Sequence, residues 1–431
     1  MEQGEHYEKM EVFKMSMLEM LSVVFFLYVL VKVYISVMQI GYVARAKHSN
    51  PVLMTPSKYM KSANYLVSTE RLKIVETLME YALFLFWLSF GIRWLDTLTW
   101  NMGPILQAVV AVNLFLIVNY IVELPFTIYK TFVIDERFKF NNMTPELFVS
   151  DQIKGGLMTL LVASVLSAAI AWIIVNVPMW WFFSFLLVFA FIVIVNLLYP
   201  TVIAPMFNKF TPLEDEELKA KIDDLLKRSG FESEGVFVVD ASKRDSRLNA
   251  YFGGLGKSKR VVLFDTLLKK LNEKELLAVL GHELGHFKHR DIYKNIAMLG
   301  GILFVGFYIF GHIPTSFFME LGVRETPAML MVVFMLLISV FIFLFMPVMS
   351  FISRRNEYEA DRYAAELCGA SDLVSALKKL VDENQSFPKA HPLTIFFYYS
   401  HPPIIERLSA LGDKSVENKG GDEALKGECS L

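Results

Sequence analysis

The sequence predicts a mainly α-helical, polytopic membrane protein with seven transmembrane helices and a small α+β domain outside the bilayer. Of its 431 residues, 54% are hydrophobic and 20% are charged. A soluble globular chain carries about 25% charged and about 45–50% apolar residues. The excess apolar residues form long uninterrupted runs, which excludes an ordinary soluble enzyme and a disordered chain. The net charge of −2 indicates no nucleic acid partner, because such partners require a basic surface.

Seven runs are long enough to cross a membrane, since a spanning helix needs about 20 mainly apolar residues. They are Leu21–Val43, Ile74–Leu95, Pro104–Ile128, Gly156–Val177, Trp180–Ile203, Ile296–Ile313 and Met329–Ser350. The first run is too long for a cleavable signal peptide, contains Lys32 and precedes no small-residue cleavage site. We therefore interpret it as the first span.

Lysine and arginine gather in the loops that follow the first and third spans. These loops carry Arg45, Lys47, Lys58, Lys61, Arg71, Lys73, Lys130, Arg137, Lys139 and Lys154. Because basic loops stay in the cytoplasm, we expect the N-terminus outside and the C-terminus inside. Two polar segments, 206–294 and 351–412, then share the cytoplasmic side. They follow spans one to five (1–205) and spans six and seven (295–350), and a disordered tail (413–431) ends the chain.

Six polar residues lie inside the predicted spans: Lys32, Glu80, Asn113, Asn119, Glu123 and Asn196. Each alone could snorkel to the membrane surface or bond a neighbouring helix. Together they favour a bundle with a wet interior, because intramembrane ionisable groups usually face a cavity.

The residue pattern of the segment 206–294 predicts a mixture of helices and strands. Thr211-Pro212-Leu213-Glu214 has the pattern of a capping box and predicts the start of a helix that ends at Gly230. Alternating apolar residues predict strands over Val236–Asp240, Ala250–Gly254 and Arg260–Asp265, and we expect the last two to form a hairpin. A second helix begins near Asn272, with Glu275 three residues later.

That second helix contains the sequence His282-Glu283-Leu284-Gly285-His286. Two histidines four residues apart lie on one face of a helix and can bind one zinc ion, while the intervening glutamate can act as a general base. The chain has only two cysteines, Cys368 and Cys429. They cannot supply a four-thiolate metal site, so histidines and carboxylates must bind the metal.

A catalytic zinc ion keeps three protein ligands and one open position. His289 is near in sequence, but three residues past His286 it turns away from the metal-binding face. Glu357 and Asp361, one helical turn apart just past the seventh span, are better candidates. One of these carboxylates could bind zinc while the other orients a ligating histidine.

These features resemble the type I CaaX prenyl endopeptidases, which are integral-membrane zinc proteases of the gluzincin kind. The resemblance runs from about residue 20 to residue 412. It is carried by the His282–His286 motif with Glu357 and Asp361, and by three further stretches. These are Leu124-Pro125-Phe126 with 129–141, Ser246–Phe252 with Arg260–Leu268, and Ser400-His401-Pro402-Pro403 with Arg407.

The resemblance implies seven helices around a hydrated chamber and a cleaved substrate of the CaaX type, prenylated or similar. It implies that Glu357 is the third zinc ligand and that Asp361 orients one of the ligating histidines without binding zinc itself. It assigns Asn249, His401 and Arg407 to positions that contact the substrate backbone or the reacting carbonyl. Residues 249–253 (Asn249, Ala250, Tyr251, Phe252 and Gly253) would bind an extended peptide as a strand edge does. Glu283, His401 and Arg407 are thus the predicted catalytic residues.

Two other functions compete with this interpretation. A membrane-protein quality-control metalloprotease would use the same site, but such proteins are shorter. A transporter or channel with a structural zinc is disfavoured, because the sequence has no internal repeat and three ligands leave an open metal position. The loop between spans six and seven is short, and no C-terminal lysine retrieval signal is present. A bacterial inner membrane and an endoplasmic reticulum membrane therefore both remain as expected locations, with the active site on the cytoplasmic side.

Overall fold

The computed structural model describes residues 16–253 and 260–417. Within this part, seven helices are long and apolar enough to cross a membrane, which confirms the predicted number. Some are interrupted by short π-helical turns. The seven spans are α1 (Met17–Ala46); α2 (Pro56–Phe86), η1 (Trp87–Gly91) and α3 (Ile92–Leu98); α4 (Pro104–Tyr129) and η2 (Lys130–Asp135); α5 (Pro145–Asn176); α6 (Trp180–Leu198), η3 (Tyr199–Ile203) and α7 (Ala204–Phe207); α11 (Asp291–Phe310); and α13 (Pro327–Cys368).

Most of these helices extend beyond their apolar runs, because capping residues rather than hydropathy set where they begin. The side chains of Ser16, Thr55, Thr144 and Thr326 each accept a hydrogen bond from the backbone amide three residues on. Such caps satisfy amide groups that the first helical turn leaves unpaired. The predicted start of the fourth span, Gly156, therefore lies inside α5, which begins at Pro145.

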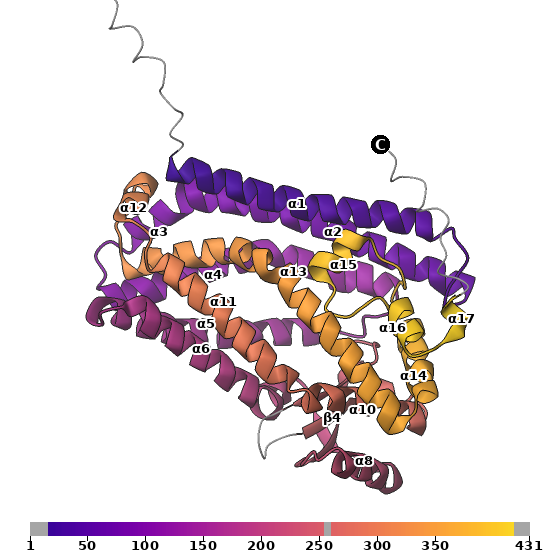
Figure 1. Cartoon of the computed structure of the whole chain (residues 1–431). Coiled ribbons are helices and arrows are strands. Elements are labelled where there is room, and N and C mark those ends of the chain that lie inside the picture. Colours follow the sequence, from indigo (N-terminus) through magenta and orange to yellow (C-terminus); the bar gives the residue numbers. More distant parts are fainter. Residues whose placement is uncertain (1–15, 254–259, 418–431) are drawn as a thin grey trace, which may run out of the picture.

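Figure 1 shows α1 and α2 side by side along one edge of the molecule, with α5 and α6 on the opposite side. The helices α11 and α13 run obliquely from the end near α12 (Thr315–Leu321) toward the α+β part. The last turns of α13 extend past the apolar run and lie beside α10 (Glu273–Lys288). One continuous helix thus joins a membrane span to the candidate site.

The polar residues inside the spans divide into two groups. Lys32, Glu80, Asn119 and Glu123 line a cavity of about 590 Å³ between α1, α2, α4 and α13, and Lys32 Nζ lies 2.6 Å from Glu80 Oε2. Asn113 instead donates to Ser164 Oγ on α5 at 2.9 Å. Asn196 is exposed and donates to a carbonyl of its own helix. Both expected behaviours, a polar interior and bonds along or between helices, therefore occur.

The α+β part contains a four-stranded sheet with the order β1-β2-β4-β3. Its strands are β1 (Phe210–Pro212), β2 (Gly235–Val239), β3 (Ala250–Gly253) and β4 (Arg260–Phe264). The predicted hairpin is confirmed, because β3 pairs antiparallel with β4, whereas β2 pairs parallel with β4. Gly254, the last residue of the predicted strand, lies outside the described residues. Since only β4 pairs with β3 among the described strands, β3 stands at the edge of the sheet.

The predicted helix start at Thr211 is wrong. Thr211 and Pro212 belong to β1 and pair with β2. The N-cap of α8 (Glu216–Arg228) lies four residues later, at Asp215, which accepts a hydrogen bond from the amide of Leu218. Thr211 and Pro212 do not start a helix because they pair with β2, and the amide of Leu213 still donates to the carbonyl of Val236 at 3.0 Å. The predicted end is confirmed, since Gly230 adopts φ +66° just after α8.

Several short helices complete the described part. They are η4 (Ala241–Lys243), α9 (Asp265–Leu268), α14 (Ala370–Glu383), α15 (Pro392–Tyr398), α16 (Ile404–Ala410) and α17 (Lys414–Glu417). The helix α17 occupies the start of the segment expected to be a disordered tail, and the rest of that tail lies outside the described residues.

Ion pairs tie the basic loops to the two polar segments. Lys58 Nζ lies 2.6 Å from Asp382 Oδ2, and Arg247 Nη2 lies 3.1 Å from Asp135 Oδ1. At the far end of α1, the amide of Leu18 donates to Glu320 Oε2 at 3.2 Å. The loops that follow the first and third spans therefore share one end of the bundle with the α+β part.

This arrangement, together with the expected cytoplasmic position of the basic loops, predicts the result of side-specific cysteine labelling. In a chain whose own cysteines are replaced by serine, Lys58→Cys and Lys243→Cys should react with an impermeant maleimide from the cytoplasmic side only. Glu320→Cys should react from the opposite side only, because α12 lies at the other end of the bundle. Labelling of positions 58 and 243 from opposite sides would contradict the topology.

Candidate active site

The helix α10 is fixed to its surroundings at its first turn. The helix begins next to Asn272, as predicted, and Asn272 forms a capping box with Glu275, in which each side chain bonds the backbone amide of the other. Glu275 is buried and also accepts hydrogen bonds from Ser375 at 2.6 Å and Lys379 at 2.7 Å, both on α14. Because charge-assisted hydrogen bonds are the stronger ones, this contact fixes α10 against α14.

Two glycines let α10 approach α13 closely. A Cβ atom built on Gly285 would lie 2.7 Å from the Cα of Ala360, and one built on Gly281 would lie 3.0 Å from Cys368 Sγ. Each glycine directly precedes a histidine of the motif. Small residues at a helix interface allow close backbone approach, and here that approach brings α13 within reach of both histidines.

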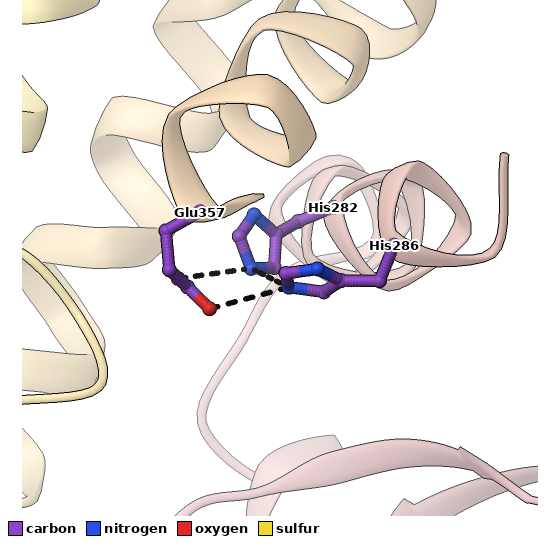
Figure 2. Close-up of side chains that lie close together, drawn as sticks. All are labelled: His282, His286 and Glu357. Carbon is purple, nitrogen blue, oxygen red and sulfur yellow. Dashed lines mark hydrogen bonds and ion pairs between the residues drawn. The ribbon is translucent and has the colours of Figure 1, made fainter. Parts of the chain in front are cut away.

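His282 and His286 of α10 face Glu357 of α13 (Figure 2). The Nε2 atoms of the histidines lie 3.2 Å apart. Glu357 Oε2 lies 3.4 Å from His282 Nε2, and Oε1 lies 3.2 Å from His286 Nε2. Three potential ligand atoms from α10 and α13 therefore lie around one point. Glu357 reaches it although it is 71 residues after His286 in the chain.

These separations fit a tetrahedral metal site. Donor atoms held about 2.0–2.2 Å from a central ion stand about 3.3–3.6 Å apart at tetrahedral angles. The three measured separations, 3.2–3.4 Å, lie close to that range. The same three residues form the one candidate metal-binding cluster found among the described residues. The geometry is therefore suited to a metal ion that keeps a further position for substrate or water.

The Nδ1 atom of each histidine, on the side of the ring away from the cluster, lies next to a carboxylate. His282 Nδ1 lies 2.8 Å from Asp361 Oδ1, and His286 Nδ1 lies 2.9 Å from Asp291 Oδ2. Such partners fix the ring orientation and leave Nε2 free to ligate. Burial alone would lower the pKa of His282, but the hydrogen bonds to Asp361 and Glu357 outweigh burial and raise it to about 9.

Asp291 is the residue that sequence reasoning missed. It starts α11 and follows Arg290, whose left-handed φ of +58° reverses the chain so that Asp291 faces back to His286. Its other oxygen accepts a hydrogen bond from Lys294 Nζ at 2.8 Å. The signal in the sequence was a single acid five residues after the motif, which is too common to stand out.

Replacing Asp291 by asparagine should weaken metal binding without removing a ligand. Loss of such a supporting carboxylate typically lowers metal affinity or activity by about 10–100-fold. Competition with a chelator of known affinity measures the change, and Asp240→Asn in the sheet region serves as the matched substitution. Unchanged metal affinity in Asp291→Asn would show that His286 needs no carboxylate partner.

Glu283, between the two histidines, is half-buried and lines a cavity of about 550 Å³ together with His282. Burial raises the pKa of the Glu283 carboxyl, while the two neighbouring histidines act in the opposite direction. The apolar residues that line the cavity include Leu373, Leu377, Leu380, Val381 and Phe387. The cavity thus places a basic carboxylate beside space for an apolar substrate group.

His401 and Arg407 reach the same cavity from the C-terminal segment. His401 Nε2 lies 3.3 Å from Glu357 Oε1, and its side chain is 63% exposed. Arg407 is buried and forms two hydrogen bonds to Asp361, at 2.8 Å and 2.6 Å, while its Nη1 lies 3.3 Å from Glu357 Oε2. Arg407 therefore holds both Glu357 and Asp361 in place, a role that the sequence did not suggest.

The predicted substrate-binding residues lie at the sheet edge. Asn249 is exposed at the cavity, and Ala250, which also lines it, begins β3. Tyr251 and Phe252 pack on opposite faces, against Phe264 and Phe231. A Cβ atom on Gly253 would lie 2.7 Å from Pro200 Cβ. Gly253, which the sequence placed among the peptide-binding residues, therefore accommodates η3 at this point.

His289, the weaker candidate for the third ligand, lies apart from the cluster. It ends α10, and its ring lies 6.2 Å from that of Tyr363. The structure thus brings together Glu283, His282, His286, Glu357, Asp361, His401 and Arg407, and places Asn249 on the wall of the same cavity.

Comparisons with known proteins identify the family. Residues 212–415 match the model of peptidase family M48, and residues 39–209 match a model described as the CAAX prenyl protease N-terminal region with five membrane helices. A CAAX prenyl protease 1 homolog of Arabidopsis thaliana is 38% identical over 302 residues, which cover 68% of this chain and 70% of the relative. CAAX prenyl protease 1 of Saccharomyces cerevisiae is 36% identical over 341 residues, 74% of either chain.

The structure is also similar to a solved one. The crystal structure of S. mikatae Ste24p superposes with a TM-score of 0.82 at 30% sequence identity, covering 91% of this chain and 98% of that chain. A peptidase family disfavours the transporter interpretation. The chain belongs to peptidase family M48 and is a membrane-embedded metalloendopeptidase of the CAAX prenyl protease kind.

Proposed function

We propose that this chain hydrolyses a peptide bond near the C-terminus of prenylated CaaX-type substrates, with a zinc ion bound by His282, His286 and Glu357. The observation that supports it most is the convergence of these three donors, 3.2–3.4 Å apart, on the cavity that β3 borders. Two imidazole nitrogens and one carboxylate are a common ligand set of catalytic zinc. The names of the relatives supply the substrate class.

A zinc ion at this position would polarise the scissile carbonyl and make a water molecule a stronger nucleophile. Glu283 takes the proton of the attacking water and later delivers it to the leaving amine. Burial raises the pKa of the Glu283 carboxyl, which makes it a stronger base than an exposed glutamate. Asp361 and Asp291 keep the two histidines oriented through their Nδ1 atoms.

His401 is the group we assign to the negative charge that develops on the carbonyl oxygen. It is exposed to the cavity and stands 3.3 Å from Glu357 Oε1, so it borders the place where the reacting carbonyl must lie. A donor in that place stabilises the transition state more than the bound substrate. Arg407 is positioned to keep Glu357 and Asp361 in place, and contact between Arg407 and the substrate stays a prediction.

The edge strand and the membrane indicate how the substrate binds. An extended peptide can add to the edge of β3 through backbone hydrogen bonds, which are nearly independent of side chains. A prenyl group favours an apolar surrounding by about 0.8 kcal/mol per buried CH₂, and the apolar residues that line the cavity, among them Leu373 and Leu377, supply one. We therefore assign selectivity to the lipid chain and to access, with the active site on the cytoplasmic side of the membrane.

Replacing Asn249 by alanine should weaken cleavage of all peptides by a similar factor of about 10, because a backbone contact serves every sequence. Bound metal should be unchanged, since Asn249 lies outside the ligand cluster. Kinetics on peptides varied around the scissile bond would check this, with the exposed Asn142→Ala as the control. A strong preference for one side chain that persists in Asn249→Ala would contradict recognition through the backbone.

Mass spectrometry of the products from matched prenylated and unprenylated CaaX peptides tests the proposed function. The full-length protein should release the C-terminal residues of the prenylated peptide, and addition of a chelator should stop the reaction. Equal cleavage of both peptides would favour a quality-control protease, and cleavage that the chelator does not affect would exclude the assigned metal.

A further inference from the structure

Ser400 contacts the ring of His401 on the side away from the metal cluster. Its Oγ lies 2.9 Å from His401 Nδ1, and the Ser400 side chain forms no other hydrogen bond among the described residues. On the opposite side of the ring, His401 Nε2 lies 3.3 Å from Glu357 Oε1. The imidazole therefore stands between a hydroxyl and a carboxylate, and each of its nitrogens faces one of them.

The backbone on both sides of His401 is held in place, whereas its ring has little to hold it. Before it, the carbonyl of Tyr399 accepts a hydrogen bond from Arg354 of α13 at 2.9 Å. After it, Pro402-Pro403 has the fixed φ of proline and leads directly into α16. The side chain of His401 is 63% exposed, so packing restrains it weakly. The contact with Ser400 is therefore left to set how the ring is turned about its Cβ–Cγ bond.

The carboxylate of Glu357 decides which nitrogen of His401 carries the hydrogen. A neutral imidazole, the form that predominates above about pH 6.5, has one donor nitrogen and one acceptor nitrogen. An ionised carboxylate only accepts hydrogen bonds, so Glu357 Oε1 favours the hydrogen on Nε2. Nδ1 is then the acceptor, and the Ser400 hydroxyl donates to it. The hydrogen bond at one ring nitrogen thus sets the state of the other.

This form of His401 is the one that the reaction needs. A negative charge develops on the carbonyl oxygen of the substrate, and only a nitrogen that carries a hydrogen can donate to it. Half a turn of the ring would present a carbon instead, and a hydrogen on Nδ1 would leave a lone pair on Nε2. We propose that Ser400 is a positioning residue that keeps the Nε2 hydrogen of His401 directed at the reacting carbonyl. This rests on the role that the proposed function gives to His401.

Ser400→Ala should lower kcat by about 3–10-fold, the effect of one hydrogen bond, and should leave KM and bound zinc nearly unchanged. The KM should stay because an oxyanion donor acts on the transition state and hardly on the bound substrate. Inhibition by a phosphonamidate peptide, whose tetrahedral anionic group resembles that transition state, should weaken by the same factor. The kinetics use full-length protein with zinc bound and a prenylated CaaX peptide.

Ser400→Thr is the conservative variant, because it keeps the hydroxyl and should keep most of the wild-type kcat. Ser409→Ala is the matched control, since it removes a hydroxyl at an exposed position of α16 and should have no effect. A wild-type kcat in Ser400→Ala would overturn the proposal. An increase of KM in Ser400→Ala with kcat unchanged would also overturn it, because Ser400 would then act on substrate binding.

A double substitution tests whether Ser400 acts through His401. His401→Ala alone should lower kcat by about 10²-fold, as loss of an oxyanion donor does. Adding Ser400→Ala to it should change kcat no further, because the ring that Ser400 holds is then absent. The same loss from Ser400→Ala with and without His401 would show that Ser400 only shapes the loop, and would overturn the proposal.

The failure of the proposed function gives a different result. His401→Ala with the wild-type rate would overturn the assignment of His401 to the developing negative charge, and the role of Ser400 with it. These rates can be measured with any peptide that the wild type cleaves, prenylated or not. Cleavage that does not require the prenyl group would therefore change the substrate class while the role of Ser400 is still decided.

Discussion

Glu283→Gln is expected to retain its fold and its metal while losing nearly all turnover. Glutamine has the size of glutamate but cannot accept the proton of the attacking water. A general base contributes about 10²–10⁴-fold to a rate, and here the same group also returns the proton to the leaving amine. The loss should therefore reach the upper end of that range, about 10⁴-fold.

The measurement is single-turnover cleavage of a peptide by full-length protein, together with metal analysis of the same sample. Glu273→Gln is the matched control, because it changes the same residue type on the same helix at an exposed position that pairs with Lys221. Cleavage by Glu283→Gln within a few fold of the wild-type rate would mean that another group acts as the base.

His286→Ala should lose bound metal and activity together. Removal of a supporting partner alone lowers metal affinity by about 10–100-fold, so loss of a ligand should exceed about 100-fold. Glu357 Oε1, 3.2 Å from His286 Nε2, would then have only His282 as a partner for the metal. Elemental analysis of the purified variant measures the metal directly.

His289→Ala is the control for this substitution, since His289 ends the same helix but lies apart from the cluster. It should retain the metal and the activity of the wild type. Full metal retention in His286→Ala would refute the ligand assignment. Loss of the metal without loss of cleavage would show that cleavage does not require the metal.

The sequence predicted the parts of the fold that local physical rules decide. Seven apolar runs became seven spans because a bilayer offers no partner for an unpaired backbone group, so long apolar runs there must be helical. The helix of the motif was predicted because Asn272 and Glu275 cap it and apolar residues follow at helical spacing. The predicted helix start at Thr211 was wrong because two possible caps lie close together, and pairing of Thr211 and Pro212 with β2 left Asp215 as the cap.

The site could be predicted only in part, because its residues meet through contacts far apart in the chain. The pair His282 and His286 needs only the helical period. The segment just past the seventh span offered Glu357 and Asp361 as candidates, and the family resemblance chose Glu357 as the third ligand. Nothing local indicated that Arg407 would bond Asp361, or that Asn384 would pair with Leu248. Such contacts depend on how α13 and α14 pack, which no single segment of sequence specifies.

Lys32 and Glu80 each oppose the entry of their own helix into a bilayer. A lysine near the centre of a helix such as α1 raises the free energy of insertion by about 2.5–3.5 kcal/mol. Once α1 and α2 lie together, Lys32 Nζ is 2.6 Å from Glu80 Oε2, and the Tyr28 hydroxyl donates to Glu80 Oε1 at 2.8 Å. Paired charges of this kind are far less costly in a membrane than single ones. The first two helices are therefore expected to enter the membrane together as one hairpin. Lys32 and Glu80 would thereby help to set the order in which the spans insert.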